Sequence, residues 1–257
     1  MIRHLILDLA LIGLAPGSVA AAEVIGSAYA ITGTVTGQPP AQARHLLSTG
    51  SKVHFNERVQ ARPSGKGQFR FVGGSRFVVG GGSVVVLDEF VFNGNAVRAR
   101  LGITKGTLRF LGSGARSGRD EISITTPVAV VGIRGTVVDV THHDGRTAFL
   151  LLHGSAQVCR RGGACQLVTE PCTGVMVESG VSAIQRRDAS ALENDFPLLA
   201  AQSELWPDYR VDTTCGVSAK AQPVERGGGT SEGQRGGHSG SGQSGGGGGV
   251  GSTDSKD

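Results

Sequence analysis

The feature that most constrains the fold of this chain is an apolar stretch at residues 126–136, with the sequence TPVAVVGIRGT. Pro127 restricts the residue before it, Thr126, to an extended conformation, and the valines that follow favour strand over helix. One arginine, Arg134, lies between two glycines of the same stretch. The stretch therefore predicts two short β segments hinged at glycines, with one charged side chain among apolar neighbours.

Arg134 has two possible roles. An arginine buried in an apolar strand needs a carboxylate or carbonyl partner, because an unpaired buried charge costs on the order of several kcal/mol. We therefore predict a structural arginine that binds an inward carboxylate, Asp88 or Glu89, or carbonyl groups near Gly132. The alternative is an exposed arginine that contacts a ligand. The structural motif predicted from this stretch consists of Thr126, Pro127, Gly132, Arg134, Gly135 and Thr136.

Residues 30–185 alternate short segments of valine, isoleucine, leucine and phenylalanine with glycines. Strand starts recur about every 8–12 residues, which indicates an all-β fold. Alternation in segments such as Leu108-Arg109-Phe110 predicts strands with one dry and one wet face. The chain has 42 glycines and only 5% aromatic residues. This composition favours thin stacked coils over a thick sandwich core, and we predict a short β-solenoid or a rolled β-sheet.

The pattern changes after the strands. Residues 186–215 are predicted to form a small helical cap, in which Pro197 begins a second helix and Trp206 docks onto the β body. The apolar residues at roughly helical intervals are Leu192, Phe196, Leu199 and Trp206. Residues 216–257 are rich in glycine and serine and contain no apolar anchor, so we predict a disordered tail.

Residues 1–22 have the pattern of a cleaved signal peptide. Arg3 and His4 precede an apolar run, and small residues before Glu23 offer a cleavage site. About ten apolar residues are too few to cross a bilayer, which needs roughly 20. The sequence therefore predicts an exported protein, periplasmic or secreted, with no membrane span in the mature chain.

The four cysteines predict two disulfides, because an even number of cysteines in an exported chain indicates disulfide bonding. Four cysteines allow three pairings. Cys159 and Cys165 flank a glycine-containing turn between two apolar segments, and facing residues in such a hairpin are close enough to be bridged. That pairing leaves Cys172 with Cys215. No CxxC pair is present, so a zinc site is not expected.

Composition and motifs exclude several classes of function. The net charge is +4, and the basic residues are scattered and do not form a stripe, so no nucleic-acid partner is expected. The most site-like cluster, residues 142–145 (HHDG), is interpreted as a polar hairpin turn, because adjacent histidines on a strand point to opposite faces. No catalytic motif, metal site or cofactor site is identified. An enzyme acting on polysaccharides would need clustered carboxylates, which the sequence lacks.

Four ordered motifs carry a family resemblance: residues 50–59 (GSKVHFNERV), 87–92 (LDEFVF), 105–110 (KGTLRF) and 126–136. Over roughly residues 34–140, the chain resembles the FecR domain, an exported bacterial module named for the regulator of ferric citrate uptake. The resemblance implies a rolled or solenoidal β domain. The chain has Gly-Gly-Ser at residues 73–75, where many members carry Asp-Gly-Ser or Asp-Gly-Thr in a turn, and glycine still suits such a turn.

The resemblance also implies a range of functions. In the family's regulators, a cytoplasmic segment controls a sigma factor, one helix crosses the inner membrane, and the FecR domain senses an outer-membrane receptor. This chain is expected to be a free-standing exported member. The main prediction is a non-enzymatic envelope protein that binds another protein or a surface polymer. The alternative is a periplasmic component of ferric-siderophore signalling of the iron dicitrate type, acting with a separate membrane partner.

Overall fold

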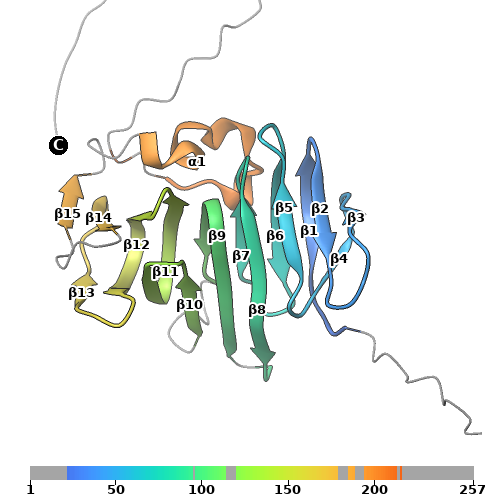
Figure 1. Ribbon diagram of the computed structural model, residues 1–257, viewed down its shortest axis with the longest axis horizontal. Helices are drawn as coiled ribbons and strands as arrows, with labels where there is room; N and C mark the ends of the chain where they lie inside the picture. The colour runs from blue at the N-terminus through green and yellow to red at the C-terminus, as the bar shows by residue number, and fades with distance from the viewer. Residues whose placement is uncertain are drawn as a thin grey trace, which may run out of the picture. The chain divides into compact units, whose positions relative to one another are not determined.

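The computed structural model describes residues 22–94, 96–113, 120–178, 185–188, 194–212 and 215 (Figure 1). Residues 1–21 of the predicted signal peptide and the predicted tail, 216–257, lie outside this part. The strands are β1 (Val24–Thr32), β2 (Val35–Gln38), β3 (His45–Leu46), β4 (Lys52–His54), β5 (Arg58–Ala61), β6 (Lys66–Phe71), β7 (Arg76–Val79), β8 (Val84–Phe92), β9 (Val97–Leu111), β10 (Glu121–Thr125), β11 (Ala129–His143), β12 (Arg146–Arg160), β13 (Cys165–Val168), β14 (Thr173–Glu178) and β15 (Gln185–Asp188). The helical elements are α1 (Pro197–Ala200) and the 3-10 turns η2 (Gln202–Glu204) and η3 (Pro207–Tyr209).

All of these strands belong to one branched sheet. Its main path has the order β15-β14-β12-β11-β10-β9-β7-β6-β1-β4. A second arm leaves β9 through β8, β5 and β2 to β3, and β13 pairs with β12. The predicted all-β class is confirmed. The more specific prediction of a solenoid or rolled sheet is not confirmed, because the pairing forms an open, branched sheet.

Three strands, β9, β11 and β12, are each 15 residues long, and the second arm branches from β9. The first half of β9 pairs with β8 and β10, whereas its second half pairs with β7 and β11. In β11 and β12 the pairing register shifts between Arg134 and Val137. Each long strand therefore changes neighbours half-way along its length.

Glycines make these bends possible. Gly135 in β11 and Gly154 in β12 adopt positive φ angles of 64° and 87°, a region that other residues avoid. A Cβ atom on Gly154 would lie 2.6 Å from the carbonyl oxygen of Gly135. The two bends lie close together, so Gly154 has no room for a larger residue. The hinge predicted within residues 126–136 lies at this point.

The two arms share one hydrophobic core, which draws residues from β1, β6 and β7 and also from β8, β9 and β10. Phenylalanine rings line its centre. The Phe69 and Phe77 rings stack at 4.8 Å between centroids, and Phe71 contacts Phe77 at 4.7 Å and Phe90 at 4.8 Å. The Phe71–Phe90 contact joins β6 to β8, which lie on different arms. Burying each phenylalanine side chain stabilises the folded state by about 1.5–3 kcal/mol relative to leaving it exposed.

The side of the sheet opposite this core is also covered, over β7, β9, β11 and β12. The covering segment, residues 194–212, is drawn in orange in Figure 1. Leu198, Leu205 and Tyr209 pack on Val78 and Leu111. Farther along the same side, Phe196 and Leu199 pack with Leu150, Leu152 and Met176.

The covering segment differs from the predicted helical cap, which is not confirmed. Pro197 does begin a helix, but α1 has only four residues and is followed by the turns η2 and η3. Trp206 contacts the β body at Tyr29 of β1, with the ring centroids 5.6 Å apart, but its side chain stays 53% exposed. Tyr209 and Leu205 are the residues of this segment that are buried beside it. No helix among the described residues is long and apolar enough to cross a membrane.

Arg109 is the largest buried charged side chain beneath this cover. Its Nε and Nη2 atoms donate to Oδ1 and Oδ2 of Asp139 at 2.6 and 2.7 Å. Its Nη1 atom donates to Oε1 of Gln202 at 3.0 Å. Alternation in residues 108–110 predicted a wet face for Arg109, and this prediction is wrong. Arg109 and Asp139 are both fully buried, because the covering segment closes over them.

We expect Arg109→Ala or Asp139→Ala to lower the free energy of unfolding by about 3–5 kcal/mol, since each leaves a buried charge without its partner. Urea unfolding measures the change. Glu121→Ala, which removes an exposed ion pair with Arg98, is the control and should cost less than about 1 kcal/mol. Unfolding midpoints for the two buried-site variants that match the control would contradict this account.

Gly154→Ala should destabilise the protein by more than about 1 kcal/mol, because alanine strains the positive φ angle and meets Gly135. Gly132→Ala is the matched control in the neighbouring strand β11. There the nearest atom to an added Cβ is 4.0 Å away, and no loss of stability is expected. Equal melting temperatures for the two variants would show that the bend does not require glycine.

Candidate functional site

The outward side of the sheet from β8 through β9, β10, β11 and β12 to β13 forms a candidate binding surface, which we call the open face. It consists of the outward residues of β8, β10 and β13, the first halves of β9 and β11, and the second half of β12. Its middle row follows the strand register directly, and its members are Glu89, Arg100, Ser123, Gly132, Gln157 and Leu167. Leu167, at the end of the row, is 65% exposed.

Two further rows flank the middle one. On one side, Val91, Arg98 and Glu121 face each other across β8, β9 and β10. On the other side, the register aligns Val86, Gly102, Thr125, Val130, Cys159 and Cys165. The inward residues between these rows, such as Leu101 and Ile124, belong to the core. Local alternation therefore places the polar side chains of these strands together on the open face.

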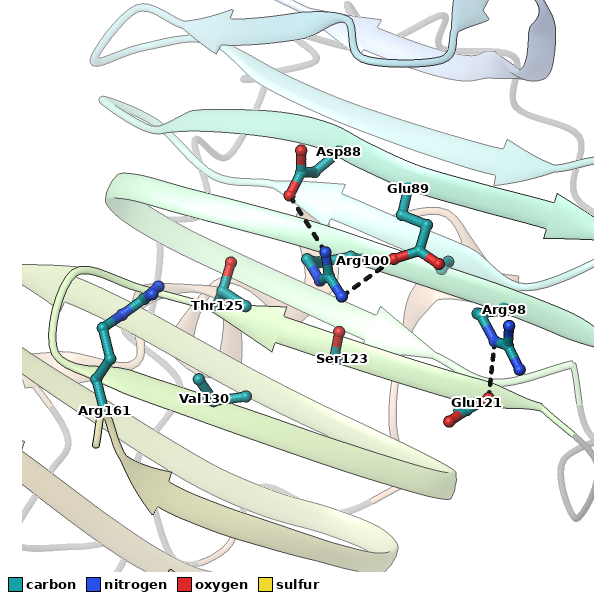
Figure 2. A pocket seen from close by; sticks show the side chains of 10 residues that line it. Asp88, Glu89, Arg98, Arg100, Glu121, Ser123, Thr125, Val130 and Arg161 are labelled. Atoms are coloured by element: carbon teal, nitrogen blue, oxygen red, sulfur yellow. Dashed lines mark hydrogen bonds and ion pairs between the residues drawn. The ribbon is translucent and has the colours of Figure 1, made fainter. Parts of the chain in front are cut away.

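Charges of both signs meet on this face (Figure 2). Arg100 lies between two carboxylates, with its Nη2 atom 3.1 Å from Oε2 of Glu89 and its Nη1 atom 4.0 Å from Oδ2 of Asp88. Arg98 binds Glu121 at 2.8 Å. These pairs are exposed, so each contributes only about 0–1 kcal/mol to stability. Their side chains remain available to an outside partner.

The open face is hollowed in two places. A cavity of about 690 Å³ lies over β8, β9 and β10, and its lining includes Arg98, Arg100, Glu121 and Ser123. Arg161 closes one side and donates two hydrogen bonds to the carbonyl oxygen of Thr126. The second cavity, of about 850 Å³, lies farther along the face. Its lining includes Glu121, Gly132, Arg134, Gln157 and Leu167. The two cavities share Glu121 and lie side by side.

The structure corrects the predicted burial of Arg134. Its side chain is exposed, because Ile133 faces the core and strand alternation turns Arg134 outward. The two carboxylates predicted to bind it, Asp88 and Glu89, pair with Arg100. Arg134 lines the second cavity, which agrees with the alternative that it is an exposed arginine near a binding surface.

The two threonines of the same motif occupy structural positions. The hydroxyl of Thr136 is 2.6 Å from the carbonyl oxygen of Arg134 and 2.7 Å from that of Ser155, across the bend. Thr126 is buried, and its hydroxyl accepts a hydrogen bond from the backbone of Ala129 at 2.9 Å. Pro127 lies in the turn between β10 and β11. The polar groups of the motif thus brace the backbone around its hinge.

The histidine cluster divides as the sequence analysis predicted. Asp144 and Gly145 form the hairpin turn with φ angles of 48° and 73°, and His143 is exposed. His142 is buried, and its Nδ1 atom lies 3.0 Å from the hydroxyl of Thr147. Burial lowers the pKa of His142 below its ordinary value, and the nearby His143 lowers it further. Among the described residues, no group of three His, Cys, Asp or Glu side chains could hold a metal.

Both predicted disulfides are present. Cys159 and Cys165 face each other across β12 and β13, with their Cα atoms 3.9 Å apart. Cys172 is bonded to Cys215, so the second bridge ties the end of the covering segment to the turn before β14. The first bridge lies in the outer row of the open face and holds β13, with Leu167, against the sheet.

Sequence reasoning missed most of the open face. Arg98, Arg100, Ser123 and Gln157 were not identified, although the alternation in VRARL at residues 97–101 places both arginines on one side. Glu57 was noted only as part of a motif. It is fully buried, and it accepts hydrogen bonds from the backbone and the ring of His54 at 2.7 and 3.0 Å.

Comparison with known families identifies a domain within this chain. Residues 57–157 match the model of the family described as FecR protein. Residues 57–157 are a FecR domain. The domain contains β5 to β11 and most of β12, and with them most of the open face. The predicted resemblance began earlier, near residue 34, and ended near residue 140, whereas the match extends to residue 157, within the second half of β12.

Solved structures give a weaker likeness. Two crystal structures of a proposed anti-sigma factor from Parabacteroides distasonis, at 1.65 and 2.50 Å resolution, align with TM-scores of 0.45 and 14% sequence identity. The alignments cover 55% and 56% of this chain and 64% of those chains. They therefore span less than two thirds of the solved proteins. No curated protein matches this chain.

The depressed pKa of His142 should make stability depend on pH. The unfolded chain takes up the proton near pH 6.5, before the folded chain does, so unfolding becomes easier as the pH falls below about 6.5. His142→Asn should make this dependence shallower. Urea unfolding between pH 5 and pH 8 measures it, and an NMR titration of the His142 ring checks the cause. A ring that titrates at or above the ordinary histidine value would contradict the assignment.

Proposed function

We propose that this chain is an exported signalling protein of the FecR type, which receives its signal by binding another protein outside the cytoplasm. The FecR domain at residues 57–157 carries the proposal. It favours the signalling alternative over the more general prediction of an envelope module that binds any protein or polymer. In this proposal the signal is uptake of a ferric siderophore, the class that the family resemblance implies.

Two further observations support action outside the cytoplasm. The structure contains two disulfides, and disulfides persist in oxidising compartments such as the periplasm. The predicted signal peptide would direct the chain there. The proposal is non-enzymatic: the chain acts through binding, and the open face is its proposed contact surface, because it carries exposed charges and two cavities.

Deleting the coding sequence should abolish induction of ferric-siderophore receptor genes in the host bacterium. Wild-type protein should restore induction, whereas Arg100→Glu should not, because the reversed charge repels whatever binds Arg100 and places a third acid beside Asp88 and Glu89. Transcript levels with and without ferric siderophore measure the effect.

Arg44→Glu provides the matched control. It makes the same charge change at an exposed position beside β3, which is three strands from β8 in the sheet. This variant should restore induction fully. Unchanged receptor transcripts in the deletion strain would contradict the proposed function.

A further inference from the structure

Gly132 is a glycine that the backbone does not require. Its φ angle lies outside the positive range, unlike those of Gly135 and Gly154. A Cβ atom at Gly132 would have only the carbonyl oxygen of Gln157 within 4.0 Å. Steric limits therefore do not explain why a residue in the middle of an otherwise valine-rich strand has no side chain. The absence of a side chain at Gly132 leaves the centre of the open face hollow.

The hollow at Gly132 lies within a longer trough. In the middle row, Ser123 and Gln157 flank Gly132 on the neighbouring strands, and their side chains make no hydrogen bonds within the described residues. In the next row, Gly102 leaves a second gap, where an added Cβ would meet its nearest atom at 3.6 Å. Polar groups along the trough are thus free to bind an outside molecule.

The two ends of the trough differ chemically. At one end, Arg100 lies between Asp88 and Glu89, in exposed ion pairs that a ligand can replace. At the other end, Leu167 is 65% exposed. The row from Glu89 to Leu167 crosses six strands. At about 4.8 Å per step it is about 24 Å long, the length of about seven residues of extended chain.

We propose that this trough binds an extended peptide segment of about seven residues, which crosses the strands over Gly132. At one end of the peptide, charged residues form ion pairs with Arg100 and Glu89. The peptide backbone forms hydrogen bonds with Ser123 and Gln157, and an apolar residue at the other end covers Leu167. That the peptide belongs to a protein partner rests on the proposed function.

Charge complementarity favours a peptide over an anionic polymer. Asp88, Glu89 and Glu121 line the same cavity as Arg98, Arg100 and Arg161. A uniformly negative polysaccharide or nucleic acid would meet three carboxylates, and like charges brought together at an interface oppose binding. A peptide that carries both signs can match both sets of side chains.

A random heptapeptide library panned on the full chain tests this inference. We expect the enriched peptides to carry both charge signs and an apolar residue near one end. Gly132→Leu should weaken their binding at least tenfold, because the leucine side chain fills the trough. Isothermal titration with the selected peptides measures the affinities.

Gly163→Leu is the matched control. Gly163 lies in the turn between β12 and β13, is exposed, and has no positive φ angle. Both leucine variants should melt like wild type, and Gly163→Leu should keep the wild-type affinity. Arg100→Glu should select peptides with a basic residue in place of an acidic one, a change that a merely structural arginine would not produce.

Selected peptides that bind Gly132→Leu as tightly as wild type would overturn the proposal. So would the absence of enriched peptides, or binding of lipopolysaccharide or heparin that Gly132→Leu abolishes. The outcome is separable from that of the transcript experiment. If peptides bind but receptor transcripts are unchanged in the deletion strain, only the signalling role is contradicted. If receptor transcripts change but no peptide binds, only the proposed binding trough is contradicted.

Discussion

The buried ion pair between Arg109 and Asp139 lies between the β-sheet and the segment that covers it, and it contacts both. The two side chains come from adjacent strands, β9 and β11, and their planar groups meet through two short hydrogen bonds. Gln202, in the covering segment, accepts a hydrogen bond from a third nitrogen of the same guanidinium, Nη1. A buried ion pair of this kind is tolerable only when its remaining donors are satisfied. The covering segment is therefore required to satisfy the buried arginine of the sheet.

The two outward surfaces of the sheet differ in whether another segment covers them. On the side of Arg109, residues 194–212 shield the strands and create two small apolar clusters. The open face has no such cover among the described residues, and its arginines form exposed pairs with weak individual contributions. The same residue type is thus structural on one surface and available for binding on the other.

Glycines divide along similar lines. Gly135 and Gly154 permit the bends at which β11 and β12 change neighbours in the sheet; the φ angles of both favour glycine, and the close approach at Gly154 requires it. Gly132 meets neither condition. Within one eleven-residue motif, a glycine needed for folding and a glycine that leaves space on the surface stand three positions apart. A motif of this kind can thus serve both the fold and a binding surface.

The sequence by itself determined the features that depend on neighbouring residues. Period-two alternation and β-branched residues indicate the strands, glycines mark the hinge within residues 126–136, and a six-residue spacing pairs Cys159 with Cys165. The Asp144-Gly145 turn and the start of a helix at Pro197 follow from local backbone preferences in the same way. These signals are local, and so they were predicted correctly.

Tertiary structure alone decided which polar side chains are buried. Arg100 and Arg109 lie in the same strand, β9, and alternate with apolar residues in the same manner, yet Arg100 is exposed and Arg109 is fully buried. Alternation shows on which side of a strand a residue lies, but it does not show what covers that side. The cover over Arg109 comes from a segment about 90 residues away in sequence. The burial predicted for Arg134 was wrong for a different reason: its apolar neighbours suggested a buried side chain, whereas alternation with the inward Ile133 turns it outward.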